Sequence, residues 1–283
     1  MSGLRVVTTA AQMSDIVAAW KSEGHSVAFV PTMGSLHDGH GALVEKAAEL
    51  ANRVVVSIFV NPLQFGAGED FDSYPRDHEA DQAFLDDRSV DVLFVPSVDE
   101  VYPGGGETTV LAGGVGDTFE GASRPGHFDG VLTVVKRLFT IVSPDFALFG
   151  RKDAQQLFLV ESMVGHESLP LTIVPIDTVR AGDGLALSSR NAYLSDDERA
   201  LARAIPGALD EAEAAPTLEG ALSAVRKRLG VSPGIAIDYV SAVDPETFRE
   251  LDASAPVDEA TLILAARIGN TRLIDNRRLG FPQ

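Results

Sequence analysis

Short apolar runs alternate with helical patterns along the first half of the chain, and this alternation constrains the fold more than any other feature. The apolar, β-rich runs are residues 26–30, 54–60, 90–95 and 146–149, and the helical patterns are residues 41–50, 77–87 and 130–142. Continuous apolar strands separated by helices are typical of a parallel sheet that is covered on both faces. The sequence therefore predicts an α/β domain built on a parallel sheet.

The pattern changes after Gly184. Helical stretches are expected at residues 195–214 and 218–229, and strand-like runs at residues 235–240, 261–266 and 271–274. Helices and strands grouped in this way are typical of an α+β unit. We therefore expect two domains, a larger one over residues 1–184 and a smaller one over residues 185–283.

Composition excludes several classes of protein. The 283 residues include 23 Lys and Arg against 41 Asp and Glu, and the formal charge of −18 repels a nucleic-acid backbone. No apolar run approaches the roughly 20 residues that span a bilayer, and residues 1–10 lack the apolar centre of a secretory signal. The absence of cysteine excludes disulfides, thiolate metal sites and a cysteine nucleophile. We expect a cytoplasmic protein with no nucleic-acid and no membrane partner.

Residues 31–40, Pro-Thr-Met-Gly-Ser-Leu-His-Asp-Gly-His, join a predicted strand to a predicted helix. Free backbone N–H groups and the positive end of the helix dipole favour an anion at such a helix start. Gly34 and Gly39 let the main chain approach that anion closely. His37 and His40 lie three residues apart, so both rings can donate hydrogen bonds to one phosphate. The alternative is a tight turn with two solvated histidines.

Polar side chains also follow two other predicted strands. Asn61 and Gln64 carry amides that donate and accept at once, which suits a substrate with a carboxylate and hydroxyls. Lys152 and Asp153, a candidate N-cap, come after a later strand. Because ligands bind beyond the carboxyl ends of parallel strands, we expect these segments and His40 to converge on one crevice. Turn residues, caps and a solvated lysine are the alternatives.

Two further stretches hold candidate anion ligands. Residues 183–191 bring Ser188, Ser189 and Arg190 together after a glycine turn, and hydroxyls with a guanidinium can bind phosphate oxygens. A capping or domain-junction loop is the alternative there. Arg124 lies in a turn-rich stretch, where it can neutralise a substrate anion or form a surface ion pair.

Six ordered segments together resemble the pantothenate synthetase family, the pantoate–β-alanine ligases of coenzyme A biosynthesis. The segments are residues 31–40, 60–66, 74–76, 126–132, 152–156 and 183–191. The resemblance covers nearly the whole chain and implies a Rossmann-like domain, a smaller C-terminal α+β domain that closes over the active site, and a homodimer. The His-x-Gly-His element alone indicates only the nucleotidylyltransferase superfamily.

The resemblance also implies which residues carry out catalysis and bind ATP. His40 would be the general acid, and His37 and Lys152 would join it in stabilising charge on the phosphates. The implied ATP-binding residues are Met33, Gly34, Ser35, Leu36, His37, Asp38, Gly39, His40, Gly150, Arg151, Lys152, Asp153, Val179, Leu187, Ser188, Ser189 and Arg190.

The predicted substrate-binding residues form a smaller set. Gln64 would contact pantoate and β-alanine, and Gln156 would contact pantoate, as the resemblance implies. Asn61 and Arg124 complete this set. The sequence does not identify the ligands of a metal ion.

The implied reaction has two steps and uses ATP with Mg²⁺. The pantoate carboxylate attacks the α-phosphorus of ATP and releases pyrophosphate, and β-alanine then attacks the pantoyl adenylate and releases AMP. An acyl adenylate is prone to hydrolysis, so the crevice should close over it. Residues 65–75 could form a mobile lid or an ordinary connection.

Three positions depart from the family pattern. Arg151 stands where the family most often has glutamate, Ala154 where it has an aromatic residue, and Leu187 where methionine is common. Two other functions stay open at this point, and Arg151 and Ala154 motivate the second of them. One is a nucleotidylyltransferase that makes no amide, and the other is an impaired homologue that binds nucleotide as a regulatory or interaction module.

Overall fold

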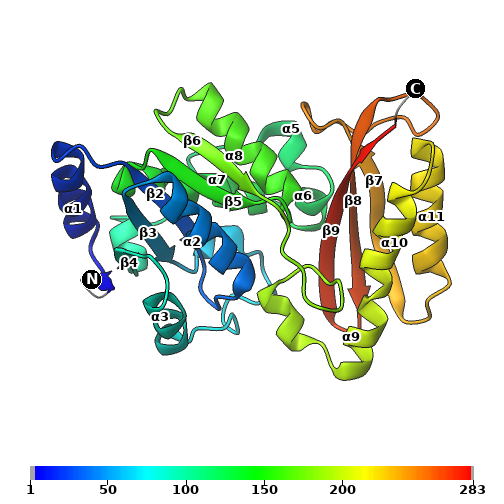
Figure 1. Cartoon of the computed structure of the whole chain (residues 1–283), viewed down its shortest axis with the longest axis horizontal. Coiled ribbons are helices and arrows are strands. Elements are labelled where there is room, and N and C mark those ends of the chain that lie inside the picture. Colours follow the sequence, from blue (N-terminus) through cyan, green and yellow to red (C-terminus); the bar gives the residue numbers. More distant parts are fainter. Residues whose placement is uncertain (1–3, 282–283) are drawn as a thin grey trace. The chain divides into compact units, whose positions relative to one another are not determined.

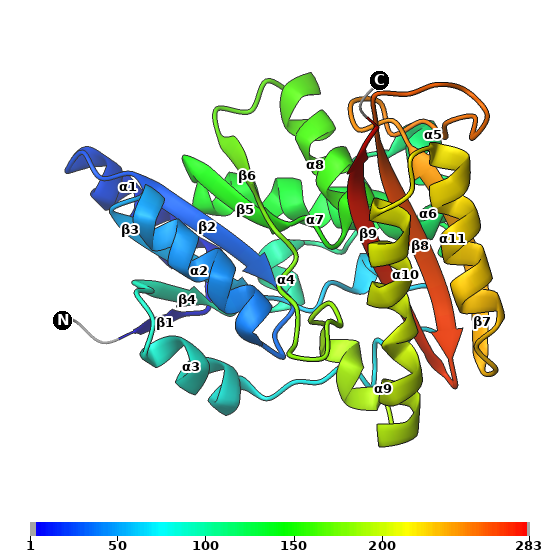
Figure 2. The same cartoon turned by 45° about the vertical axis from the view of Figure 1, so that its right-hand side comes forward.

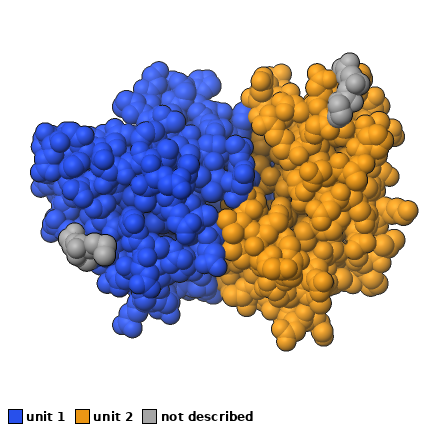
Figure 3. All heavy atoms as spheres, in the orientation of Figure 1, with its two compact units in different colours: residues 1–151, 155–177 blue, residues 152–154, 178–283 orange. Residues whose placement is uncertain are grey.

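The computed structural model describes residues 4–281, which form two compact units (Figure 1 and Figure 3). The first unit runs to Arg151 and includes Gln155–Asp177, and the second contains Lys152–Ala154 and the chain from Thr178 onward. The predicted domain boundary after residue 184 lies beyond this division. Residues 178–184 belong with the second unit, because Arg180 pairs with Asp275 there.

A six-stranded parallel sheet forms the centre of the first unit, which confirms the predicted fold class. Its strands are β1 (Arg5–Val7), β2 (Val27–Thr32), β3 (Arg53–Ile58), β4 (Val92–Phe94), β5 (Phe146–Gly150) and β6 (Thr172–Ile176). Their order is β1-β4-β3-β2-β5-β6, so the chain reverses its direction across the sheet at the β2–β5 pair. In such sheets ligands bind outside the carboxyl ends of the strands at the reversal.

Helices cover both faces of this sheet (Figure 2). Helices α1 (Ala10–Ser22), α7 (His127–Val142) and α8 (Ala154–His166) contribute to one core, and α2 (Asp38–Leu50) and α3 (His78–Asp86) to the other. Successive side chains of a strand point to opposite faces, so Phe29 lies in the first core and Val30 in the second. Shorter elements are η1 (Pro62–Gln64), α4 (Val98–Val101), α5 (Gly113–Gly116) and α6 (Glu120–Ser123).

The sequence analysis did not predict β1, α1 or β6. In β6, Pro175 argues against a strand, because proline cannot donate to a β-ladder. The structure places β6 at the edge of the sheet, where one side of the strand has no ladder to maintain, and proline is tolerated.

The second unit is a three-stranded antiparallel sheet with helices, as expected of a smaller α+β domain. Its elements are η2 (Ser189–Tyr193), α9 (Asp196–Ala202), α10 (Ala204–Glu213), α11 (Leu218–Gly230), β7 (Ile235–Val243), β8 (Glu259–Ile268) and β9 (Thr271–Gly280). Leu209 of α10, Val225 of α11 and Leu264 of β8 are fully buried in one core. The sheet therefore carries its helices on one apolar face.

The single helical stretch predicted over residues 195–214 is two helices. Helix α9 ends at Ala202 and α10 begins at Ala204. Pro206 has no N–H to donate to the carbonyl of Ala202, and its ring would clash with that carbonyl inside a continuous helix. Starting a new helix at Ala204 places Pro206 in its first turn, where a proline is tolerated. None of the helices among residues 4–281 has both the length and the hydrophobicity to cross a membrane.

Candidate active site

The turn after β2 is closed by the two predicted histidines. His37 is the N-cap of α2, and its Nδ1 accepts a hydrogen bond from the backbone N–H of Gly39 at 3.2 Å. Nδ1 of His40 accepts one from the backbone N–H of His37 at 3.3 Å, which completes a capping box. The two ring centroids are 4.1 Å apart. Both imidazoles therefore lie at the N-terminus of α2, where the helix dipole favours an anion.

These caps fix the proton on each imidazole. An Nδ1 atom that accepts a hydrogen bond carries no proton, so the proton of the neutral ring lies on Nε2. Each ring thus has its N–H on the edge opposite the cap. A phosphate oxygen is an acceptor for such a donor.

Asp81 of α3 holds the same turn from the other side. Its Oδ2 accepts from the backbone N–H of Ser35 at 3.0 Å, and its Oδ1 accepts from that of Leu36 at 2.7 Å. Ser35 and Gly34 have φ values of 53° and 84°, in the left-handed region. A Cβ on Gly34 would lie 2.8 Å from Asp81 Oδ2, so only glycine fits there.

A buried amide pair follows β3. Asn61, only 1% exposed, donates from Nδ2 to Gln64 Oε1 at 3.1 Å and to the carbonyl oxygen of Gly130 at 3.0 Å. Its Oδ1 accepts from the Tyr102 hydroxyl at 2.8 Å and from the Leu63 backbone N–H at 3.3 Å. Both donors and the carbonyl of Asn61 are therefore occupied. The side chain thus orients Gln64, and the predicted contact of Asn61 with a substrate stays a prediction.

Gln64 lies between this network and the turn after β2. Its Oε1 faces the Asn61 donor, and its Nε2 lies 3.2 Å from Met33 Sδ. The amide therefore directs its donor side toward the first of the predicted ATP-binding residues. Gly130 makes this packing possible, because a Cβ there would lie 2.2 Å from the Leu63 carbonyl oxygen.

Arg124 forms an ion pair with Glu69. Its Nε and Nη2 donate to the two Glu69 carboxylate oxygens at 2.9 and 2.5 Å, and both side chains are largely buried. The hydrogen bond from Arg124 lowers the pKa of Glu69. The charge of Arg124 is thus balanced by Glu69 in this structure, and its contact with a substrate anion stays a prediction. Glu69 belongs to residues 65–75, so the ion pair fastens that loop; its role as a lid stays a hypothesis.

His127 completes the support of Gln64. Its Nδ1–H donates to the Gln64 carbonyl oxygen at 2.8 Å, and its Nε2 accepts from Arg124 Nη1 at 2.9 Å. This pattern requires a neutral ring. Burial, with a contribution from the Arg124 charge, lowers the pKa of His127 to about 4.

Arg151 and the start of α8 follow β5. The Arg151 backbone N–H donates to the Ile176 carbonyl oxygen at 2.8 Å, and its Nε lies 3.1 Å from Asp177 Oδ1 on an exposed surface. On α8, Gln155 is the structural glutamine, since its buried amide binds the Val115 and Thr118 carbonyl oxygens. Gln156 is half-buried. Its contact with pantoate stays a prediction.

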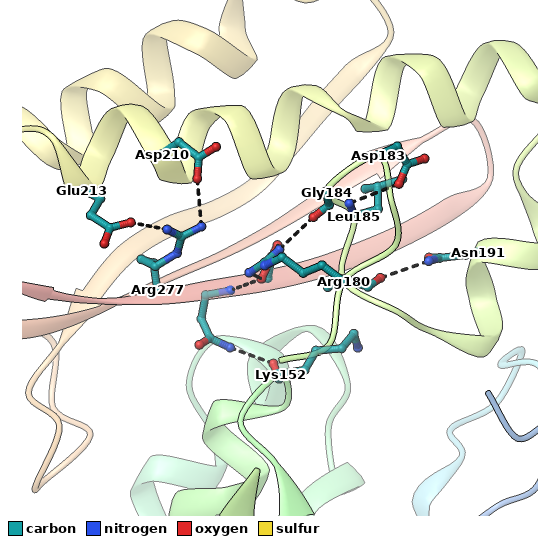
Figure 4. Close-up of polar contacts among 12 residues, drawn as sticks. Lys152, Arg180, Asp183, Gly184, Leu185, Asn191, Asp210, Glu213 and Arg277 are labelled. Carbon is teal, nitrogen blue, oxygen red and sulfur yellow. Dashed lines mark hydrogen bonds and ion pairs between the residues drawn. The ribbon is translucent and has the colours of Figure 1, made fainter. Parts of the chain in front are cut away.

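The other predicted ATP-binding residues lie in the second unit, and Lys152 is the one of them that Figure 4 labels. The Leu187 backbone N–H donates to the Val179 carbonyl oxygen at 2.9 Å, so the two residues face each other across a hairpin. Ser188 caps η2 by accepting from the Arg190 backbone N–H at 3.3 Å. Lys152 Nζ lies 3.6 Å from Asp153 Oδ1, and the Lys152 side chain is 19% exposed. A lysine this covered is not an ordinary solvated one.

The comparisons with known proteins agree with this geometry. The sequence model described as pantoate-beta-alanine ligase matches residues 5–278. The chain belongs to the pantoate-beta-alanine ligase family. Pantothenate synthetase of Leifsonia xyli is 52% identical over 280 residues, covering 98% of this chain and 97% of that protein.

Solved structures of the pantoate-beta-alanine ligase family have the same fold. A pantothenate synthetase from Thermus thermophilus is 47% identical with a TM-score of 0.90, covering 96% of this chain and 98% of that one. A pantoate-beta-alanine ligase from Francisella tularensis, described as complexed with beta-gamma ATP and beta-alanine, is 33% identical with a TM-score of 0.80. Each chain is covered to 97% in that match. Membership of this family agrees with the observed fold, and it makes ligation the reaction to test.

The first unit brings the turn after β2, Gln64 and Gly150 to the carboxyl ends of β2, β3 and β5. Sequence reasoning missed Asp81, Tyr102 and His127 as supports of that site. A signal for Asp81 existed, because an acid stands one helical turn before the buried Leu85 on the apolar face of α3. Tyr102 had no such signal, because its partner Asn61 is distant in sequence.

Proposed function

We propose that the chain ligates (R)-pantoate and β-alanine to pantothenate at the expense of ATP, through a pantoyl adenylate. The observation that carries this is the contact of Gln64 Nε2 with Met33 Sδ at 3.2 Å. It sets an amide suited to a hydroxy acid beside a capped helix N-terminus suited to a triphosphate. The family match over residues 5–278 supplies the reaction.

In the first step the pantoate carboxylate oxygen attacks the α-phosphorus and pyrophosphate leaves. Negative charge grows on the phosphate oxygens, and His37 and His40 donate to them through Nε2–H while the α2 dipole adds positive potential. His40, the general acid that the resemblance implies, would here stabilise the leaving pyrophosphate through the Nε2–H hydrogen bond, and the step needs no net proton transfer from the neutral ring. Lys152 adds a further positive charge in this proposal. No protein nucleophile is needed, because orientation and charge stabilisation account for the catalysis.

The side-chain amides of Gln64 and Gln156 position the pantoate carboxylate for attack. Asn61 fixes Gln64 with Oε1 turned inward, so the Gln64 Nε2 donates to the pantoate carboxylate or its hydroxyls. Gln156 gives a second contact with pantoate. In the second step the β-alanine amine attacks the acyl carbon, the amide bond forms, and AMP leaves. The amine proton leaves as the amide forms, and no side chain is assigned as its acceptor.

The remaining ATP contacts are assigned to the turn after β2, to Gly150 and Arg151, and to the residues of the second unit named above. Among residues 4–281 no group of three or more His, Asp or Glu side chains has the arrangement of a metal site. We propose that Mg²⁺ enters bound to ATP, since Mg²⁺ is typically held by substrate phosphates with one or two carboxylates. It would supply charge neutralisation on the phosphates.

Three further assignments are part of this proposal. The second unit closes over the bound substrates and keeps water from the adenylate. The protein acts as a homodimer. It works in the cytoplasm, where the sequence analysis placed it.

An omission assay tests the proposed function. AMP release is measured with ATP, pantoate and β-alanine, and then with each acid left out. The proposal expects AMP turnover only when both acids are present. AMP or pyrophosphate turnover that ignores β-alanine would favour a simple nucleotidylyltransferase, and no turnover with intact ATP binding would favour a regulatory homologue.

A further inference from the structure

Two consecutive residues of β9, Asp275 and Asn276, bind two segments that are far apart in the sequence. Asp275 pairs with Arg180, and Asn276 bonds to the main chain of Lys152. All four residues belong to the second unit. Figure 4 shows the Lys152 main chain and Arg180 meeting side chains from the β9 ribbon.

The Arg180 contact is a buried, two-pronged ion pair. Nη1 and Nη2 of Arg180 donate to the Asp275 carboxylate oxygens at 2.6 and 3.0 Å, and Asp275 is only 3% exposed. Nη1 also donates to the Gly184 carbonyl oxygen at 3.2 Å. The guanidinium of Arg180 therefore connects β9 to the first arm and to the turn of the hairpin that carries Val179 and Leu187. The hydrogen bond with Asp275 raises the pKa of Arg180, so the pair stays charged.

The hairpin has little regular structure of its own. Among the described residues, its ladder is the single bridge between Arg180 and Ala186, flanked by the bonds from Leu187 N–H to the Val179 carbonyl oxygen and from Ala181 N–H to the Leu185 carbonyl oxygen. Three contacts hold it in place: Asp183 pairs with Arg199 of α9 at 2.8 Å, Leu185 is buried in the core of the second unit, and Arg180 binds it to β9. The strand that binds it is rigid, because Asp275 and Asn276 pair with Leu264 and Ile263 inside a long antiparallel ladder.

The second contact fixes the segment that carries Lys152. Asn276 Nδ2 donates to the Lys152 carbonyl oxygen at 2.8 Å, and the Asn276 backbone N–H donates to Asp275 Oδ1 at 2.8 Å. Successive side chains of a strand leave opposite faces, so one dipeptide can reach two segments at once. The hydrogen bond between them links Asp275 and Asn276, which we call the two anchor residues.

We propose that Asp275 and Asn276 are positioning residues of the nucleotide site, holding Lys152 and the 179–190 segment in the arrangement that binds ATP. This rests on the proposed function, which assigns those two segments to ATP. Neither residue touches the substrate in this account. Their effect is on the affinity for ATP, and the pantoate contacts of the first unit are unaffected.

The same strand supplies a matched control. Arg277 follows Asn276 and binds Asp210 at 3.0 Å and also Glu213, both exposed carboxylates of α10 (Figure 4). It contacts neither nucleotide segment. Arg277→Ala therefore removes ion pairs from β9 and keeps the contacts of Asp275 and Asn276 intact.

The test measures the dissociation constant of ATP by calorimetry, with no other substrate, for Asp275→Asn, Asn276→Ala and Arg277→Ala. We expect the first two to weaken ATP binding by about tenfold, the scale of one lost hydrogen bond, and Arg277→Ala to leave it within about twofold. The KM for pantoate should stay within about twofold in all three. Asn276→Ala keeps the buried ion pair between Arg180 and Asp275. If Asp275→Asn does not fold, the ATP dissociation constant of Asn276→Ala alone tests the inference.

Two results would overturn the inference. One is an ATP dissociation constant in Asn276→Ala within about twofold of the unchanged protein. The other is an equal rise in the KM for ATP and the KM for pantoate, which would indicate a general structural defect. The binding measurement needs no turnover, so failure of the ligase assay and failure of this inference are separate results.

Discussion

The backbone N–H of His37 donates to Nδ1 of His40 at 3.3 Å, so the residue proposed as general acid also closes the cap of α2. The cap and the proposed catalytic role thus involve opposite edges of one ring. The cap occupies Nδ1, and the reaction would use Nε2–H. A substitution at His40 can therefore be chosen to keep one role and remove the other.

His40→Gln and His40→Ala separate those roles. Glutamine at the third position of a helix can complete a capping box, whereas alanine cannot. We expect both variants to slow pyrophosphate release in a single turnover by about 10²-fold or more, the scale of one lost transition-state donor. Only His40→Ala should also lower the free energy of unfolding, by about 1 kcal/mol. A near-normal rate of pyrophosphate release in His40→Gln would show that His40 caps the helix and has no catalytic role.

Gln64→Glu replaces the amide donor that faces Met33 with a negatively charged acceptor. The new carboxylate would repel the pantoate carboxylate, so we expect the KM for pantoate to rise by at least about tenfold, as for a lost charge-assisted contact. The KM for ATP should change far less. Steady-state kinetics with each substrate varied checks this, and an equal effect on both constants would argue against a substrate contact.

His127 predicts a pH dependence of stability. Its pKa is about 4 in the folded protein, against 6.5 for an ordinary histidine, so between these values the unfolded chain binds the extra proton. The free energy of unfolding should therefore fall by up to about 3 kcal/mol as the pH drops from 6.5 to 4. Urea unfolding across this range, compared with His127→Gln, isolates the effect from carboxylate titration. Parallel pH profiles for the two proteins would contradict it. Arg124, Glu69 and Glu120 provide the charges that act on the ring.

Arg151→Glu restores the residue that is common in the family. The side chain is exposed and pairs with the more exposed Asp177, so the free energy of unfolding should change by less than about 1 kcal/mol. If Arg151 lies near the triphosphate, the charge reversal should raise the KM for ATP by about fivefold at low salt and less at high salt. A KM that does not respond to salt would place Arg151 outside the nucleotide site.

The parallel sheet and the turn after β2 were predictable because their signals are local. Apolar runs separated by helices indicate the sheet, and the glycines with His37 and His40 mark a helix start within ten residues. The division of residues 195–214 into two helices had a local cause in Pro206, and the periodicity of the flanking residues concealed it.

The supporting contacts were not predictable, because they join residues that are far apart in sequence. Asn61 was expected to bind a substrate, and only its contacts with Tyr102 and Gly130 show that its groups are occupied. Arg124 was expected to neutralise a substrate anion or to form a surface ion pair, and the sequence does not show that Glu69, which is far away along the chain, pairs with it. A polar residue after a strand looks the same in sequence whether it binds a ligand or another side chain.

The most direct test of the central claim uses pantoate labelled with heavy oxygen in its carboxylate. If that carboxylate attacks the α-phosphorus of ATP, one labelled oxygen passes to the phosphate of AMP and the other stays in the new amide. Mass spectrometry of the products should therefore find one labelled oxygen in AMP. AMP without label, or label in inorganic phosphate, would contradict a pantoyl adenylate.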